Sequence, residues 1–203
     1  MNLGQRTVFV VDDDPQMRKS LCRLLDAAGL GNEAFASATE FLEAYDSTRP
    51  GCLLLDVRMP DMSGLECQTK LAESGIEIPV ILISGTADVR TAVQAMERGA
   101  IDLLEKPFDD ERLLERVELA FQRDEAARGR REGQSSLRAR FSVLTSREQE
   151  VMQCLAAGKN TKQLARELGI SSKTADVHRA NILEKLGIDN VVQLTNLLHQ
   201  LDP

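Results

Sequence analysis

The first 121 residues alternate short apolar runs with segments whose apolar residues recur at helical spacing. Strands that are apolar throughout, rather than at every second position, are expected to have helices on both faces. The pattern therefore predicts an α/β domain with a doubly wound, five-stranded parallel sheet. Its strand candidates are residues 7–11, 32–36, 52–56, 78–84 and 101–105, and its helix candidates are residues 15–29, 37–46, 63–74, 88–99 and 109–121.

The pattern changes after residue 121. The apolar stripe of the last helix, which includes Val117 and Phe121, indicates that this helix runs on toward Ala127. The sequence RGRREGQSS, residues 128–136, has no apolar period and holds two glycines. We therefore predict a flexible or fraying stretch there, within a linker that spans residues 122–142.

Apolar residues return at helical spacing in residues 143–203. Each of four segments opens with Ser or Asn and three close with Gly, the residues preferred at the two ends of a helix. We predict a small all-helical domain, of about 60 residues. Its helix candidates are residues 146–158, 160–169, 171–187 and 190–201.

The composition, 42% hydrophobic and 28% charged, is that of a soluble globular protein long enough for two small domains. Its apolar runs are far shorter than the roughly 20 residues of a membrane span. The first residues lack a secretory pattern. We expect a cytoplasmic protein with no membrane partner. Four cysteines without C-x-x-C spacing and only two histidines predict core thiols and no structural metal site.

The charges are unevenly distributed. Residues 1–121 carry 12 basic and 22 acidic side chains, residues 122–142 carry 6 and 3, and residues 143–203 carry 7 and 7. Two chemically different halves are thus joined by a basic segment.

Polar side chains gather at the carboxyl ends of the predicted strands, where ligands bind in doubly wound sheets. Adjacent carboxylates repel and burial penalises each charge, so a cation or strong donors must lie among them. Carboxylate oxygens suit a hard cation, above all Mg²⁺. The strand-end residues are Asp12, Asp13, Asp56, Ser84, Gly85 and Lys106.

Several of these acids and polar groups also have a purely structural explanation. Asp14, directly before Pro15, fits the N-cap of a helix. Ser84 could merely cap the following turn, and Lys106 could be a solvated surface charge. Their joint placement at successive strand ends favours a functional site.

The chemistry of such a site is phosphoryl transfer. With Mg²⁺ bound, Asp56 is the candidate nucleophile, which would form an aspartyl phosphate. The transferring group carries negative charge, which Mg²⁺, the Lys106 ammonium, the Ser84 hydroxyl and the Gly85 N–H would each stabilise.

The motifs VVDDDP, CLLLDVRMPDMSG, ILISG and LLEKPF resemble the receiver domains of bacterial response regulators, over residues 5 to about 121. The resemblance implies a flavodoxin-like receiver fold. It also implies that Asp13 binds Mg²⁺ directly, that Asp12 helps through water, and that Asp56 is phosphorylated and binds the metal. The carbonyl of Arg58 is implied as a further ligand.

Residues 143 to about 200 resemble the helix-turn-helix domain of the LuxR, NarL and FixJ family, on the sequence LTSREQEVMQCLAAGKNTKQLARELGISSKTADVHRANILEKL. With the receiver in front and DVHRAN in the third helix, the whole chain resembles a FixJ-type regulator. The segment LARELGISSKTADVHRANI by itself predicts two helices around a Gly-centred turn, with Ser171 capping the second.

The helix after Ser171 places Ala175, Ile182 and Leu186 on one stripe, at 100° per residue, and leaves its opposite face for a major groove. His178, at the margin of the stripe, is predicted to pack rather than to catalyse. The DNA-binding candidates are Thr161, Lys162, Lys173, Thr174, Asp176, Val177, Arg179, Ala180 and Asn181.

Base readout is expected to depart from that of related domains, which often carry Lys at positions 176 and 180. Asp176 could accept a hydrogen bond from a cytosine amino group, and Val177 and Ala180 suit thymine methyl groups. Lys162, Lys173 and Arg179 are candidates for phosphate contacts. A neutral domain lacks strong attraction to phosphate, so one subunit should bind DNA weakly.

These features predict a phosphorylation-dependent transcriptional regulator that accepts phosphate from a sensor histidine kinase and binds double-stranded DNA. We expect phosphorylation to pair two receivers through residues 88–104, and RNA polymerase is a further candidate partner. Leu103, where receivers usually carry an aromatic residue, argues against a simple aromatic rotamer switch.

Two alternatives stay open. A Mg²⁺-dependent phosphohydrolase would use the same aspartyl phosphate, but dehalogenase-like phosphatases usually place the nucleophile after strand 1, whereas Asp56 follows strand 3. A phosphorylation-independent regulator is the other alternative, and the complete acid set with Ser84 and Lys106 argues against it.

Overall fold

The structure is a computed structural model, and it describes residues 6–86 and 89–201. The chain divides into two compact units, Met1–Arg128 and Gly129–Pro203. Asp88, with which the helix predicted at residues 88–99 begins, lies outside the described residues, as do both ends of the sequence.

The described part of the first unit holds a parallel sheet, formed by β1 Thr7–Val11, β2 Gly31–Phe35, β3 Gly51–Asp56, β4 Val80–Ser84 and β5 Asp102–Glu105. The strand order is β2-β1-β3-β4-β5, which is that of flavodoxin-like sheets. The predicted fold class is therefore confirmed. The order reverses between β1 and β3, and the carboxyl ends of these two strands lie side by side.

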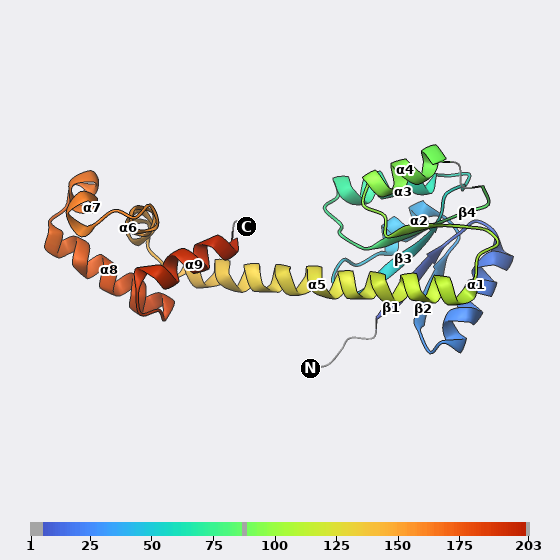
Figure 1. Ribbon diagram of the computed structural model, residues 1–203, viewed down its shortest axis with the longest axis horizontal. Helices are drawn as coiled ribbons and strands as arrows, with labels where there is room; N and C mark the ends of the chain where they lie inside the picture. The colour runs from blue at the N-terminus through green and yellow to red at the C-terminus, as the bar shows by residue number, and fades with distance from the viewer. Residues whose placement is uncertain (1–5, 87–88, 202–203) are drawn as a thin grey trace. The chain divides into compact units, whose positions relative to one another are not determined.

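Helices cover both faces of this sheet, and they are α1 Pro15–Ala27, α2 Ala38–Ala44, α3 Gly64–Glu73, α4 Val89–Glu97 and α5 Asp110–Ser142 (Figure 1). Successive side chains of a strand point to opposite faces, so each strand contributes to two cores. In β1, Phe9 and Val11 pack with residues of α2 and α3, whereas Val8 and Val10 pack with residues of α1 and α5. This double burial explains why the three central strands β1, β3 and β4 are apolar along almost their whole length, whereas the edge strands β2 and β5 contain polar and exposed residues.

The second unit contains the end of α5 together with α6 Ser146–Ala156, α7 Thr161–Leu168, α8 Ser172–Leu186 and α9 Val191–Leu201. Thr145 and Asn160 cap α6 and α7 through reciprocal bonds with Glu148 and Gln163. Gly169 ends α7 at φ 65°, a left-handed conformation that glycine adopts without strain. The predicted end residues cap α7 (Asn160 and Gly169) and α8 (Ser171 and Gly187), whereas α6 is capped by Thr145, one residue before the predicted Ser146, and by Ala157. The helices surround a core that includes Leu155, Leu164, Ile182, Leu186 and Leu194.

The helix α5 is longer than predicted, because it continues to Ser142. The prediction of a flexible or fraying stretch at residues 128–136, inside a linker at residues 122–142, is wrong for this structure. Most side chains of this stretch are exposed, so its apolar period lapses although the backbone stays helical. A helix that is polar all round gives no periodic signal, since no side of it faces a core. Buried residues return at Leu137 and Phe141.

A buried ion pair attaches α5 to the start of β3. Asp124 is 3% exposed and accepts hydrogen bonds from the Gly51 N–H at 2.9 Å and from Arg128 Nε at 2.8 Å. Arg128 also donates to the backbone carbonyls of residues 47–49. The last turn of α5 in the first unit is therefore fixed to the loop that precedes β3.

The cysteines are free thiols, and the prediction that they lie in the core is confirmed for Cys52, Cys67 and Cys154, whereas Cys22 is half-buried. Burial raises the pKa of Cys67 to about 11. Among the described residues, no helix has the length and hydropathy of a membrane span.

The C-terminal unit should lose stability in acid through Glu148. Its carboxylate is 3% exposed, and the bonds from Lys185 and from the Thr145 backbone lower the pKa of Glu148 from 4.5 to about 2. A lowered folded pKa means that this stabilisation is present above about pH 4.5 and disappears as the pH falls toward about 2. Glu148→Gln should destabilise the unit by about 1 to 2 kcal/mol near neutral pH.

Hydrogen exchange of peptides from α6 and α8 measures this difference in the full chain. The gap between wild type and Glu148→Gln should narrow as the pH falls. A gap of constant size down to about pH 3 would contradict the assigned role of Glu148.

Candidate functional site

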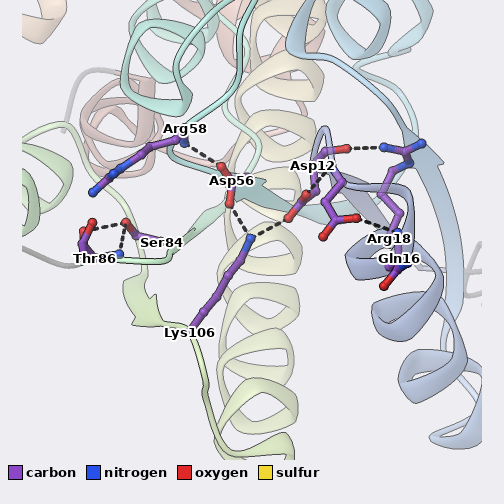
Figure 2. A network of polar contacts seen from close by, with 9 residues as sticks. Asp12, Gln16, Arg18, Asp56, Arg58, Ser84, Thr86 and Lys106 are labelled. Carbon is purple, nitrogen blue, oxygen red and sulfur yellow. Dashed lines mark hydrogen bonds and ion pairs between the residues drawn. The ribbon is translucent and has the colours of Figure 1, made fainter.

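The ammonium group of Lys106 lies between two buried carboxylates at the carboxyl edge of the sheet (Figure 2). It donates to Asp12 Oδ2 at 2.8 Å and to Asp56 Oδ1 at 2.6 Å. Asp12 follows β1, Asp56 ends β3 and Lys106 follows β5, so residues up to 94 positions apart meet at one point. Asp12 is 2% exposed and Asp56 is 5% exposed, and the ammonium is the countercharge that makes their burial tolerable.

The loop after β1 holds Asp12 in position. Asp12 Oδ1 accepts from the Asp14 N–H at 2.9 Å, and the Asp12 carbonyl accepts from Arg18 Nη1 at 2.6 Å. Asp14, which directly precedes Pro15, is the N-cap of α1. Its side chain accepts a hydrogen bond from the Gln16 N–H at 2.8 Å. The structural interpretation of Asp14 is confirmed, since this acid stabilises a helix end.

The backbone after β3 holds Asp56. The Arg58 N–H donates to Asp56 Oδ2 at 2.6 Å, so each oxygen of the carboxylate has its own donor. Gly64 lies so close behind the strand end that an added Cβ would be 2.5 Å from the Asp56 carbonyl oxygen. Only glycine fits at this position without a shift of the strand end.

Burial and charge act against each other on the titration of this cluster. Burial raises the pKa of Asp56, and the hydrogen bond and charge of Lys106 oppose that rise. Burial alone would lower the pKa of Lys106, but its bonds to Asp12 and Asp56 outweigh that effect and raise it. Lys106 therefore stays charged at neutral pH and is available to an incoming anion.

The Ser84 hydroxyl bonds to the next turn rather than to the acid cluster in this structure. Ser84 is 1% exposed, and its hydroxyl donates to the Thr86 carbonyl at 2.7 Å and accepts from the Thr86 N–H at 3.3 Å (Figure 2). This is the turn-capping alternative of the sequence analysis. Gly85 is exposed, and no atom of the described residues lies within 4 Å of the place its Cβ would take.

Asp13 is exposed, in contrast to Asp12, because consecutive side chains at the end of a strand point in different directions. Within residues 6–86 and 89–201, no three Asp, Glu, His or Cys side chains lie close enough together to hold a metal ion. Asp12 and Asp56 nevertheless fit Mg²⁺, which binds through one or two carboxylates and completes its shell with waters and phosphate oxygens.

The second group of predicted residues lies on α8 and at the start of α7. Ala175, Ile182 and Leu186 are buried, as the helical stripe predicts, and Ser171 caps α8 by accepting from the Thr174 N–H at 3.0 Å. Thr161 is half-buried. The other DNA-binding candidates are exposed, namely Lys162, Lys173, Thr174, Asp176, Val177, Arg179, Ala180 and Asn181.

One hydrogen bond joins α7 to the exposed face of α8. Thr161 Oγ1 donates to Asp176 Oδ1 at 3.1 Å. His178, beside this face, is half-buried, as its packing role predicts.

Sequence reasoning missed the polar residues that anchor the elements around these sites. Gln68 is 4% exposed and donates to the carbonyls of Ala95 at 3.2 Å and Arg98 at 3.0 Å, at the end of α4. Gln68 in α3 and Asp124 in α5 share a signal that could have indicated their roles. Each is a polar residue one turn from a buried residue of the same helix, Leu71 for Gln68 and Phe121 for Asp124.

The fold and the two groups of residues define a class of protein. An acid and lysine cluster at the edge of a flavodoxin-like sheet, followed by a helix-turn-helix unit, is the combination of a signal-receiving transcriptional regulator. Comparison with known proteins leads to the same class. Residues 8–118 match the family model of the response regulator receiver domain, and residues 142–198 match that of the bacterial regulatory proteins of the luxR family.

Several relatives are similar to this chain over almost its whole length. Response regulator protein TmoT of Ectopseudomonas mendocina is 41% identical over 99% of this chain and 91% of its own length. Transcriptional regulatory protein FixJ of Bradyrhizobium diazoefficiens is 40% identical over 94% of this chain and 93% of its own length. The chain therefore belongs to the FixJ-like response regulators, the two-component transcriptional regulators with a receiver and a LuxR-type DNA-binding domain.

Solved structures of such proteins are also similar to this chain. The structure of the response regulator StyR has a TM-score of 0.83 and 43% identity, over 97% of this chain and 99% of that one. Full-length FixJ from B. japonicum has a TM-score of 0.60 and 38% identity, over 97% of both chains.

The close approach of Gly64 to the Asp56 carbonyl can be tested by adding one methyl group at position 64. Gly64→Ala should displace the end of β3 and slow phosphorylation of the receiver by a small acyl phosphate on the order of 10- to 100-fold. Mass spectrometry of the phosphorylated protein over time measures the rate. Gly133→Ala is the matched control, because nothing lies within 4 Å of that position, and it should leave the rate unchanged. An equal rate for Gly64→Ala would contradict the close-approach argument.

Proposed function

We propose that Asp56 is the residue of this response regulator that accepts the phosphoryl group from its sensor histidine kinase. The observation that carries the proposal is the position of Lys106, whose ammonium joins Asp12 and Asp56 across β1, β3 and the end of β5. An attacking Asp56 oxygen needs a free lone pair, and each of its oxygens accepts a single hydrogen bond from the described residues, at the carboxyl end of β3. The receiver itself supplies the catalytic groups of this transfer.

Mg²⁺ is the proposed cofactor. Asp12 and Asp56 would hold it, with Asp13 and the Arg58 carbonyl as the further ligands implied by the family resemblance. When bound, it neutralises the negative charge that develops on the phosphoryl oxygens. The Lys106 ammonium, which in this structure donates to both carboxylates, would then donate to a phosphoryl oxygen.

Ser84 is the proposed link from Asp56 to α4. Its hydroxyl holds Thr86 through two bonds. If it turned to a phosphoryl oxygen, and the Gly85 N–H bound another, both bonds to Thr86 would be lost. The loop after β4 leads to α4, so this exchange would couple the chemistry to the α4 surface. Leu103, half-buried against the core, would respond by packing.

The α4 surface is the proposed site at which two phosphorylated receivers pair. Val89 is 81% exposed, Val93 49% and Met96 50%, and their spacing of four and three residues places them on one stripe. Such a stripe is unusual on a protein that acts alone. A pair would engage two DNA half-sites, which raises the effective affinity of weakly binding domains by about 10² or more. DNA-bound pairs would present RNA polymerase with one fixed surface.

The central test measures phosphorylation and DNA binding in one experiment. Asp56→Asn should abolish labelling by an acyl phosphate and with it the increase in sequence-selective DNA binding, while the basal binding stays. Binding is measured by fluorescence anisotropy with and without the phosphodonor. Asp61→Asn, which changes an exposed acid of the following loop, is the control and should respond as wild type does. Normal labelling of Asp56→Asn would contradict the assignment of Asp56 as the phosphorylated residue.

Pairing is tested by sedimentation of the unmodified and phosphorylated protein at micromolar concentration. The phosphorylated form should have twice the mass, and Val93→Lys should keep it monomeric because a charge then lies in the apolar stripe. Phosphorylation of this variant should proceed as in wild type. If both wild-type forms had the same mass while DNA affinity still rose, pairing would not be the mechanism.

A further inference from the structure

We infer that Thr161 is a positioning residue for base recognition, which holds the Asp176 carboxylate so that one of its oxygens reads an amino group in the major groove. The inference rests on the proposed role of the exposed face of α8 in DNA binding. It changes the role of Thr161, which was predicted to contact DNA itself.

The geometry assigns a direction to this hydrogen bond. A carboxylate only accepts, so the Thr161 hydroxyl donates, and it does so to Asp176 Oδ1 at 3.1 Å. The hydroxyl proton is then no longer available to a DNA phosphate. Asp176 Oδ2 has no hydrogen-bond partner among the described residues, and Asp176 is exposed on the same face as Val177. One oxygen is held by the protein and the other is left for DNA.

An oxygen that only accepts discriminates among bases. In the major groove, cytosine and adenine offer an amino group, whereas guanine offers two acceptors, and thymine offers an acceptor and a methyl group. Adenine also places its N7 acceptor beside the amino group, which repels a carboxylate. Asp176 should therefore favour cytosine at one position of the site and reject guanine and thymine there.

Thr161 makes this discrimination effective by reducing the freedom of an exposed side chain. An unrestrained Asp samples several rotamers, and it must lose that freedom when it meets a base. The Asn160 and Gln163 capping box fixes the N-terminus of α7, so the backbone that carries Thr161 is held in place. One exposed hydrogen bond of this kind is worth about a three- to tenfold bias in the orientation of the carboxylate.

A purely structural role for the same bond has different consequences. If Thr161 only stabilised the contact between α7 and α8, its loss would weaken binding to all DNA sequences by the same factor. If it positions Asp176, its loss changes the preference at one base pair and leaves the preferences at the other positions as they are.

The experiment determines binding sites by selection from random DNA with the phosphorylated full chain, and then measures affinities for the four variants of the assigned base pair. Thr161→Val removes the hydroxyl and keeps the shape, and it should reduce the preference for cytosine about three- to tenfold. Thr161→Ser keeps the hydroxyl and should restore the wild-type preference. Lys173→Ala is the control for a phosphate contact, and it should weaken binding to all DNA sequences by the same factor.

A second pair of variants tests the orientation itself. In Asp176→Asn, the amide oxygen can still accept from Thr161, so the amide N–H₂ would point to DNA and the preference should move to guanine or thymine. In the double variant Thr161→Val, Asp176→Asn, the amide can turn either way. The preference for guanine or thymine should therefore weaken.

The outcomes separate this inference from the proposed function. If wild-type protein showed no sequence preference at all, both would be wrong. If wild type were selective and Thr161→Val kept the same preference within about twofold, only the positioning role would be overturned. The same holds if Thr161→Ser behaved like Thr161→Val, since the hydroxyl would then not be the active group.

Discussion

An ammonium group between two buried carboxylates is the interaction on which the receiver unit depends. Asp12 and Asp56 end neighbouring strands, and without a cation their charges would repel each other in a place with little water. Lys106 supplies that cation from the far side of β4, and its two bonds join three parts of the chain. The site is thereby ready for chemistry, since the same positive charge that balances two acids can bind a phosphoryl group.

Other buried acids in the protein follow the same rule. Asp124 is paired with Arg128 and a backbone N–H, and Glu148 is paired with Lys185 and the cap of α6. These two pairs are structural because each joins two elements inside the fold, Asp124 linking α5 to the start of β3 and Glu148 linking α6 to α8. The acids at the sheet edge differ in position, since Asp12 and Asp56 lie at the carboxyl ends of β1 and β3. The same residue types therefore stabilise the fold in its interior and form the proposed phosphorylation site at the edge of the sheet.

The charge balance of α6 to α9 favours recognition of DNA bases over general attraction to DNA. Residues 143–203, the part of the second unit after α5, carry equal numbers of basic and acidic side chains, so their long-range attraction to phosphate is small. On the proposal that the α8 face binds DNA, selectivity would come from the shape and polarity of that face, where Val177 is apolar and Asp176 is an acceptor. Weak single binding also makes the DNA response sensitive to the number of linked subunits, which suits control by pairing.

Local features of the sequence determined most of the architecture. Apolar runs, helical stripes, the caps Asp14, Asn160 and Ser171 and the glycine after α7 all act within a few residues, so they predict the strands and helices closely. Strand-end positions also predicted that Asp12, Asp56 and Lys106 come together, because all parallel strands end at one edge. The prediction that α5 ends near Ala127 was wrong, because the exposed part of this helix has no apolar period that would indicate it.

Only the tertiary structure decided which polar atoms are paired. Whether Asp12 or Asp13 is buried, whether Ser84 bonds to Thr86 or to the acids, and whether Thr161 meets Asp176 depends on the directions of side chains after packing. The same is true of Gln68 and Asp124, whose partners lie up to 73 positions away. Residue spacing along a chain defines which element a side chain belongs to, but the partner of that side chain is defined by packing between elements.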